Sequence, residues 1–383
     1  MLTNYGSMTK STMSNGRTTS EQQCKRYEST PTFRELRSVL LSTRNHYPKL
    51  SPGQSALMTA SAKRHGLVVT LDDRPGWFAI WNESKKVGSF HGPSNSLNSR
   101  RARRTCANKR RAKEELQRAG VRVPPYTVVR RLVDLEALQN GRFPLWTKPA
   151  TGAGGAGHRF AKDYAGLVDA LEETLARGGT ALVEPFFDGV DVRAVVIGGR
   201  FICAATRINA HVIGDRMRSV ADLIGDKNRY RKGHPHLARF PLKNAPEDIA
   251  GTVPRSGEFV FLSPVSNLHD GGDSVDVTNR LSPKMVDYIE TAARAVRGGG
   301  CLGIDLLTTS FTDETQATLI EINTGANMLT HHYPVFGASR DATNAIVEEM
   351  LRRSSRRMQR REGARFSSWA NTRARLARWI HRL

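Results

Sequence analysis

The chain has 383 residues and a net charge of +22, and its 39% of hydrophobic residues can fill the cores of two or three lobes. No run of 18 apolar residues occurs and the start lacks an apolar core, which argues against a membrane span and a signal peptide. The four cysteines, Cys24, Cys106, Cys203 and Cys301, have no disulfide or metal spacing and indicate a reducing, cytoplasmic location.

The positive charge is concentrated in two basic blocks. Residues 100–131 contain 12 Lys and Arg against 2 Glu, and residues 351–383 contain 11 Arg against 1 Glu. Each block therefore carries +10, and the rest of the chain is nearly neutral. This distribution argues against a basic substrate and favours anionic partners, such as nucleotide phosphate, an acidic peptide or nucleic acid.

The first elements in chain order follow a Ser/Thr/Asn-rich segment, residues 1–31, which is expected to be a disordered tail. Residues 32–125 predict an N-terminal α/β lobe with a linker helix. Its elements are a helix (SALMTASAKRHG), two strands (GLVVTLD and WFAIWN) and one long helix (SLNSRRARRTCANKRRAKEELQRAGV) that ends at Gly120. Residues 126–190 predict a small lobe with strand FPLWTKP, a glycine loop, a helix over 163–177 and strand ALVEPFF.

Residues 191–353 predict a larger lobe. VDVRAVVIGG and RFICAATRIN indicate a hairpin, SPKMVDYIETAARAVRG a helix, and CLGIDLLTTSF and TLIEIN two strands joined by TDETQ. A helix is expected over about 338–353 and a basic tail helix over 354–383. The apolar stripe of that tail leaves two interpretations open: contact with a membrane surface or anionic partner, or a solvated, self-packing helix. Helices mixed with antiparallel hairpins indicate the α+β class.

A glycine-rich stretch, TGAGGAGH, follows the predicted strand that ends near Lys148. It contains a formal G-x-G-x-x-G at Gly152, Gly154 and Gly157, but it lies mid-chain among hairpins, and no Gly-Lys-Ser/Thr follows. Small residues let backbone N–H groups approach phosphate oxygens closely, and Lys148 adds a cation. The stretch therefore predicts phosphate binding, with a flexible surface loop as the alternative.

The stretch LIEINTGANML places Glu321 and Asn323 on the same face of a predicted buried strand. Asp305, one strand earlier, comes level with Glu321 if the two strands form a hairpin. Buried carboxylates are costly without a partner, and Mg²⁺ prefers one or two carboxylates together with phosphate oxygens and water. The three side chains predict an Mg²⁺ site beside nucleotide phosphates; carboxylates paired with nearby arginines are the alternative.

Several motifs in fixed order resemble the ATP-grasp carboxylate–amine ligase family, closest to the ATP-grasp part of cyanophycin synthetase and of bifunctional glutathione synthetase. They are VEPFFDGVDVRAVVIGGRFICAATRINAHVIGD, DLIGDKN, RKGHPHL, DVTNRLSP, GIDLL and EINTGANMLTHHYP, within about residues 55–350. The resemblance implies an ATP-grasp fold, two α+β lobes gripping ATP, preceded by a smaller α/β lobe. Two departures are Gly214-Asp215-Arg216 in place of Gly-Asp-Gly and NTGANM in place of Asn-x-x-Pro-Gly.

The resemblance also implies the residues that hold ATP and Mg²⁺, with two metal ions expected and Mn²⁺ as an alternative. The phosphates are expected between two lysines and the loop: Lys109, Lys148, Gly152, Gly154, Gly155 and Gly157. The adenosine is expected against Glu184, Phe186, Phe187 and Asp191. The implied metal ligands are Asp305, Glu321 and Asn323. The implied catalytic arginines, near the phosphate or the activated substrate, are Arg193 and Arg207.

The implied activity is ATP-dependent formation of an amide or peptide bond through an acyl phosphate, joining amino acids or small peptides and releasing ADP. Two alternatives are an ATP-grasp phosphotransferase and a basic nucleic-acid-binding protein. Aromatic residues make up only 7% of the chain and no known nucleic-acid module is recognised, which disfavours the second. The family further implies a homodimer or tetramer. His331 and His332 leave a substrate contact and a packing role equally open.

Overall fold

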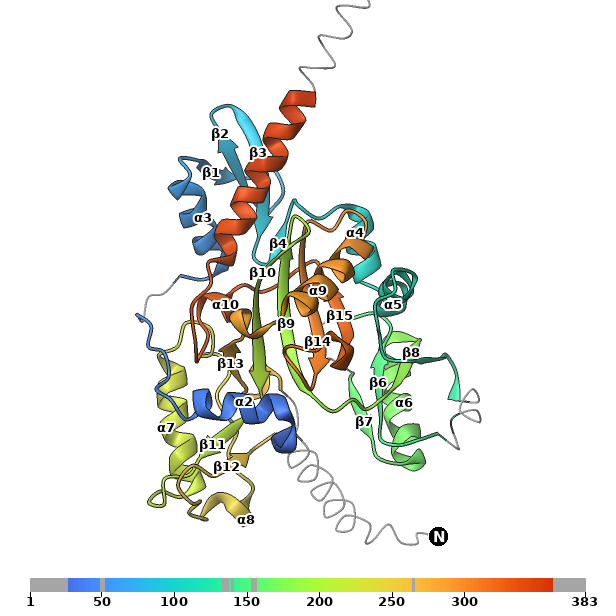
Figure 1. Ribbon diagram of the computed structural model, residues 1–383, viewed down its shortest axis with the longest axis vertical. Helices are drawn as coiled ribbons and strands as arrows, with labels where there is room; N and C mark the ends of the chain where they lie inside the picture. Colours follow the sequence, from blue (N-terminus) through green and yellow to red (C-terminus); the bar gives the residue numbers. More distant parts are fainter. Residues whose placement is uncertain are drawn as a thin grey trace, which may run out of the picture.

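The computed structural model describes residues 27–48, 52–132, 138, 141–152, 157–263 and 266–360. Within these ranges the strands form two four-stranded sheets, one five-stranded sheet and one two-stranded sheet, with helices packed around them (Figure 1). Of the disordered tail expected over residues 1–31, residues 1–26 lie outside the described residues, whereas residues 27–29 are helical and residue 31 begins a further helix. Of the tail helix expected over 354–383, residues 354–360 are helical and the remainder lies outside the described residues.

The five-stranded sheet occupies the centre of the molecule and is antiparallel throughout. Its order is β13 (Asp273–Asp276), β10 (Arg200–Ile208), β9 (Val190–Ile197), β14 (Cys301–Thr308) and β15 (Ala317–Asn323). The β9–β10 and β14–β15 hairpins agree with the sequence prediction. The order also places β14 directly beside β9, which no local pattern indicates.

The two faces of this sheet differ in chemistry. On β9, Val192, Ala194 and Val196 point to an apolar core that also contains side chains of α2 (Pro31–Leu40) and α9 (Pro283–Ala295). Because side chains alternate along a strand, Asp191 and Arg193 point to the opposite face. The sheet therefore buries its apolar side under two helices and keeps a charged strip on the other.

The small lobe contains the second four-stranded sheet, in the order β5 (Thr127–Val129), β8 (Ala181–Pro185), β6 (Leu145–Pro149) and β7 (Arg159–Ala161). Helix α6 (Tyr164–Gly178) packs on it through Leu167 and Leu171 and agrees with the predicted helix within one residue at each end. Asp163 caps this helix by accepting a hydrogen bond from the Gly166 amide, and Gly179 ends it at φ 63°.

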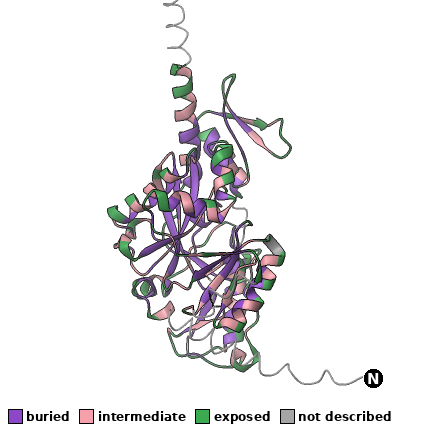
Figure 2. Ribbon diagram, turned by 90° about the vertical axis from the view of Figure 1, so that its right-hand side faces the viewer, coloured by how far each residue is buried: buried purple, intermediate pink, exposed green. Residues whose placement is uncertain are grey.

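The N-terminal sheet consists of β1 (Val68–Leu71), β2 (Phe78–Asn82), β3 (Lys85–His91) and β4 (Ser94–Asn95), with α3 (Gln54–Arg64) against it. A helix over residues 342–360 shares its core through Val347 and Met350. This helix starts later and ends later than the sequence predicts, and its far end extends beyond the body of the molecule (Figure 2).

Between β10 and β13 the chain forms a separate small layer. It contains β11 (His211–Ile213), β12 (Phe259–Phe261), α7 (Val220–Lys232) and the one-turn helix α8 (Glu247–Ala250). The ring of Phe33 on α2 lies 5.4 Å from that of Phe259 on β12, measured between ring centroids. The segment that starts with α2 therefore runs across this layer.

One long helix expected before Gly120 is instead two helices, α4 (Arg100–Cys106) and α5 (Lys109–Arg118). The break falls at Asn108, whose side chain caps α5 by accepting a hydrogen bond from the Arg111 amide. The Lys109 amide donates to the Ala150 carbonyl at 2.8 Å, a tertiary contact that an uninterrupted helix could not make. The break sets Lys109 at the first turn of a new helix, against the small lobe.

Candidate active site

Two lysines converge on one buried glutamate where α5 meets the small sheet. Glu184 on β8 is 4% exposed, and its Oε2 lies 2.8 Å from Nζ of Lys148 on β6. Nζ of Lys113 on α5 lies 3.2 Å from Oε1, although the two atoms lack hydrogen-bond geometry. Two ammonium groups and one carboxylate leave a net positive charge, which suits an anionic ligand.

Burial governs the ionisation of this cluster. It lowers the pKa of Lys113 to about 8, with Lys148 adding to the shift and Glu184 opposing it. Burial likewise lowers the pKa of His158 to about 3, and the charges of Lys148 and Lys109 act in the same direction. His158 is therefore neutral near pH 7, whereas Lys113 loses its proton as the pH rises through about 8.

Lys109 links the small lobe to the large sheet. Its Nζ donates to the Gly152 carbonyl at 2.9 Å and lies 3.5 Å from Oε1 of Glu321 on β15. The Lys109 side chain is only 5% exposed, so its charge sits where the two lobes meet. A phosphate placed there would be adjacent both to the glycine loop and to the acidic end of the large sheet.

The glycine loop is described only at its ends. Gly152 has φ 118° and Gly157 has φ 75°, conformations that favour glycine over residues with a Cβ. Thr151 forms an isolated β-bridge with Asn108, which fixes the start of the loop beside α5. Gly154 and Gly155 lie outside the described residues, so their predicted phosphate contacts stay predictions.

A group of charged side chains, the sheet-face network, lies on the charged strip of the large sheet. Its members are Asp191, Arg193, Arg207, Asp305 and Glu321.

Asp305 is the most buried member of the sheet-face network, and both arginines of the network donate to it. It is 2% exposed, accepts from Nη2 of Arg193 at 2.7 Å and from Nη2 of Arg207 at 3.4 Å, and also pairs with Nε of Arg193. Burial alone would raise the pKa of Asp305, but the guanidinium groups of Arg193 and Arg207 outweigh it and lower the pKa below the usual value. The carboxylate is therefore charged and held between two cations.

Asp191 forms a two-pronged ion pair with Arg207. Nε and Nη2 of Arg207 donate to its two oxygens at 2.7 and 2.6 Å. Burial raises the pKa of Asp191 above the usual value despite Arg207, and the nearby charge of Asp305 adds to the rise. The predicted ribose contact of Asp191 is not tested, and in the described residues its partner is an arginine.

The predicted metal ligands do lie together. Asp305 and Glu321 are register partners across β14 and β15, as the hairpin prediction requires. Asn323, two residues farther along β15, donates from Nδ2 to Oδ2 of Asp305 at 3.4 Å. Two carboxylates and an amide oxygen on one face fit an Mg²⁺ ion that takes its remaining ligands from phosphate and water.

That fit has a limit. No third His, Cys, Asp or Glu in the described ranges joins these side chains to make a metal cage from protein alone. Asp305 is paired here with arginines, as the alternative interpretation expected, whereas the cation beside Glu321 is Lys109. The residues therefore fit a metal that arrives with nucleotide phosphates, whose binding would draw Asp305 partly away from its arginines.

Aromatic side chains lie at the end of β8, where the adenine is expected. The ring of Phe186 packs edge-on against Phe160 at 5.8 Å between centroids, and the Phe186 amide donates to the Pro144 carbonyl at 3.1 Å. Phe187, next in the chain, is half-buried. The strand end that carries Glu184 thus also carries the predicted aromatic wall.

The sequence interpretation did not single out Lys113 and His158. Lys113 lies one helical turn after Lys109, so the i, i+4 spacing on one helix face was the signal that could have found it. His158 had no such signal, because its proximity to Lys148 and Lys109 arises only in the folded protein. His331 is buried with no hydrogen-bond partner for either ring nitrogen among the described residues, whereas His332 contacts Thr343.

Comparisons with known proteins agree with this geometry. Residues 106–326, more than half of the chain, match the family model described as an ATP-grasp domain. The chain therefore belongs to the ATP-grasp domain family. The predicted ATP-grasp fold is thereby confirmed.

Three relatives illustrate the likeness. The chain is 28% identical over 267 residues to cyanophycin synthetase of Crocosphaera subtropica, covering 64% of this chain and 30% of that protein. It is 28% identical over 229 residues to the glutathione biosynthesis bifunctional protein of Streptococcus agalactiae, covering 54% and 30%. The crystal structure of a bifunctional glutathione synthetase from Pasteurella multocida superimposes with a TM-score of 0.58 at 22% identity, covering 78% of this chain and 44% of that one.

These matches span about a third of the length of the curated relatives, so they establish the shared domain and its fold. In the part of the chain that the structure describes, no helix is both long and apolar enough to cross a bilayer.

Proposed function

We propose that this protein is an ATP-dependent carboxylate–amine ligase that joins amino acids or small peptides through an acyl phosphate and releases ADP. The observation that carries the proposal is that one buried lysine, Lys109, contacts both lobes. Lys109 connects the Gly152 carbonyl of the small lobe to Glu321, the register partner of Asp305 on the large sheet. Phosphoryl transfer needs positioning and charge neutralisation at such a junction rather than a covalent nucleophile.

In this proposal the small lobe holds the nucleotide. Lys109 and Lys148 neutralise phosphate charge, and Lys113 supplies a further cation. The backbone of Gly152, Gly154, Gly155 and Gly157 closes over the phosphates. Glu184, Phe186 and Phe187 line the adenine, and Asp191 holds the ribose.

The large sheet supports the transferring phosphoryl group. Asp305, Glu321 and Asn323 would hold Mg²⁺, one or two ions with Mn²⁺ as a substitute, which would neutralise charge on the phosphates. Arg193 and Arg207 would orient the acyl phosphate and its leaving oxygen with the donors that they no longer need for Asp305 when it holds a metal. The positive side chains that now balance the acids thus become contacts for the substrate.

The same proposal divides the chain into functional parts. Residues 32–125 form an N-terminal lobe and linker helix, 126–190 the small ATP-grasp lobe and 191–353 the large lobe with the metal site. We expect the enzyme to act in the cytoplasm, as a homodimer or tetramer.

The deciding experiment measures ADP release from MgATP against amino acids offered singly and in pairs, with mass spectrometry of the products. ADP together with a condensed product, formed only with pairs, is the expected result. ADP together with a phosphorylated single substrate would replace the ligase proposal with a phosphotransferase. Absence of turnover with every pair, while ATP still binds, would contradict an amino-acid ligase.

A further inference from the structure

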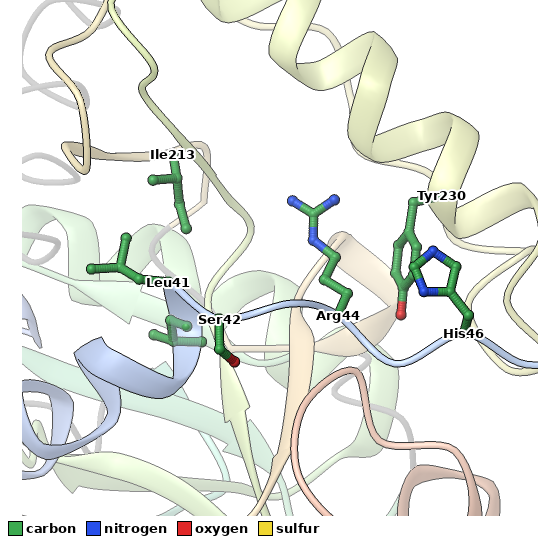
Figure 3. A pocket seen from close by; sticks show the side chains of 7 residues that line it. Leu41, Ser42, Arg44, His46, Ile213 and Tyr230 are labelled. Atoms are coloured by element: carbon green, nitrogen blue, oxygen red, sulfur yellow. The ribbon is translucent and has the colours of Figure 1, made fainter.

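A cavity lies away from the proposed nucleotide site, between the segment that follows α2 and the layer formed by α7 and β11. It has a volume of about 380 Å³ and opens to solvent. Figure 3 shows the side chains that line it. One side is apolar and consists of Leu40, Leu41 and Ile213. The volume falls in the range of small-molecule sites, which usually combine apolar walls with a few placed polar groups.

The polar side of the cavity is built around Arg44. Its guanidinium lies 5.2 Å from the ring centroid of Tyr230 and reaches into the space between Ile213, at the end of β11, and Tyr230 of α7 (Figure 3). Arg44 makes no ion pair or side-chain hydrogen bond with any residue that the structure describes, and the Tyr230 ring is its one aromatic contact. Its planar N–H edge is therefore available to a ligand.

The Tyr230 ring, on which Arg44 stacks, is held in place by other residues before any ligand binds. The Tyr230 hydroxyl donates to the Asn45 carbonyl at 2.9 Å, and the His46 ring packs edge-on against Tyr230 at 5.8 Å between centroids. An arginine stacked on a fixed ring loses little freedom when it binds, which favours affinity.

No carboxylate lines this cavity among the described residues. The nearby acid of α7, Asp226, already pairs with Arg218 and Arg229. Burial lowers the pKa of Lys227 to about 8, Asp273 opposes that shift, and the charge of Arg44 adds to it. Asp273, the acid whose charge also reaches Tyr230, is paired with Lys227 and Arg231, so no described carboxylate pairs with Arg44 at the cavity.

We propose that this cavity is a second binding site, which takes a small carboxylate carrying an apolar group. One guanidinium edge matches a single carboxylate in a two-pronged geometry, and the leucine and isoleucine wall accepts an aliphatic side chain. The carboxylate could belong to a free acid or to the end of a peptide, and phosphate shares part of the same chemistry. This site is independent of the ligase proposal, because none of its residues belongs to the nucleotide site.

The test uses the full chain and isothermal titration with N-acetyl-leucine. The neutral amide of the same compound, a dipeptide ending in leucine, and inorganic phosphate are the comparison ligands. Binding of N-acetyl-leucine without binding of its amide is the expected result. Tighter binding of the dipeptide would assign the site to peptide ends, and competition by phosphate would show that the anion alone is recognised. If neither the acid nor the dipeptide binds, the proposal is overturned.

Variants then locate the site. Arg44→Gln should weaken binding roughly ten- to a hundredfold, the cost of losing a charged hydrogen bond. Arg34→Gln, the same change at an exposed arginine of α2 outside the cavity, should leave the affinity unchanged. Ser42→Phe should block the cavity while keeping the charge. Equal affinity of the wild type and Arg44→Gln, with thermal unfolding confirming that both are folded, overturns the proposal; if Arg44→Gln fails to fold, Ser42→Phe decides it.

Discussion

Two clusters of paired charged side chains in this protein, the Asp273 network and the sheet-face network, differ in how far they are exposed to solvent. The Asp273 network, made of His211, Lys227, Arg231 and Asp273, ties α7 to β11 and β13. Asp273 Oδ2 lies 2.7 Å from Lys227 Nζ, and Oδ1 lies 3.0 Å from Arg231 Nη1. Remaining donors are used by main-chain carbonyls: Lys227 donates to His211 at 2.7 Å and Arg231 to Phe240 at 2.7 Å.

The difference lies in exposure. In the Asp273 network Lys227 and Arg231 have side chains that are 2% and 1% exposed, whereas in the sheet-face network the side chain of Glu321 is 26% exposed. Arg193 and Arg207 are also partly open, at 17% and 21%. A closed ionic group serves the fold, while an open one can exchange its partners for a ligand. A buried ion pair alone does not identify a functional site. Charged side chains that remain partly exposed, and that a ligand can therefore contact, are the better indication.

The largest expected effect is on the closed network. Asp273→Ala leaves two buried cations without their counter-ion, which should lower the free energy of unfolding by about 3–5 kcal/mol. Urea denaturation measures the loss. The control, Asp270→Ala, removes an exposed acid whose nearest cation, Lys243, is 3.7 Å away, and should change stability by less than about 0.5 kcal/mol. A loss for Asp273→Ala below about 1 kcal/mol would contradict the comparison.

The next effect is on catalysis at the open network. Glu321→Gln should slow MgATP-dependent ADP release by about 100- to 1000-fold, the usual cost of removing one group that stabilises developing charge. Stability should change little, because Glu321 is partly exposed and its nearest cation, Lys109, lies 3.5 Å away. Steady-state kinetics and thermal unfolding are the measurements. Glu314→Gln, on the turn before β15, is the matched control, and a near-normal rate for Glu321→Gln would remove Glu321 from the metal site.

A smaller effect concerns the pH dependence of ATP binding. Burial lowers the pKa of Lys113 to about 8, so its charge is present below that pH and is lost as the pH rises through it. If Lys113 contributes to phosphate binding, ATP affinity should fall by up to about tenfold between pH 7 and pH 9. Lys113→Arg keeps its charge over this range and should flatten the profile. A profile that is equally steep in Lys113→Arg would assign the pH dependence to another group.

The smallest effect tests the helix break. Asn108→Ala removes the cap of α5 and should cost about 1 kcal/mol of stability, together with a modest loss of ATP affinity, because Lys109 sits at that first turn. Ser99→Ala removes the corresponding cap of α4, where Ser99 accepts from the Ala102 amide, and should cost a similar amount of stability without affecting ATP. Denaturation and ATP titration on both variants separate the two roles. Equal ATP affinities would show that the cap does not position Lys109.

Part of this arrangement is readable from local pattern. The Gly198-Gly199 turn between alternating strands predicts the β9–β10 hairpin, and TDETQ between two apolar runs predicts β14–β15. The level positions of Asp305 and Glu321 follow from that second hairpin. The break at Asn108 was missed because the stretch is rich in good helix formers. The capping residue Asn108 is a local signal for it, and the contact of Lys109 with Ala150 adds a tertiary one.

The sequence by itself determined the periodicity: Asp191 and Arg193 alternate with Val192 and Ala194, so the first half of β9 had to place charge on one face and apolar side chains on the other. Tertiary structure decided which charges meet. Insertion of β14 between β9 and β15 sets Asp305 opposite Arg193, and the packing of α5 brings Lys109 to Glu321. Such contacts join segments far apart in the chain, and closing those loops is favoured only by the burial of the whole core, which no local pattern records.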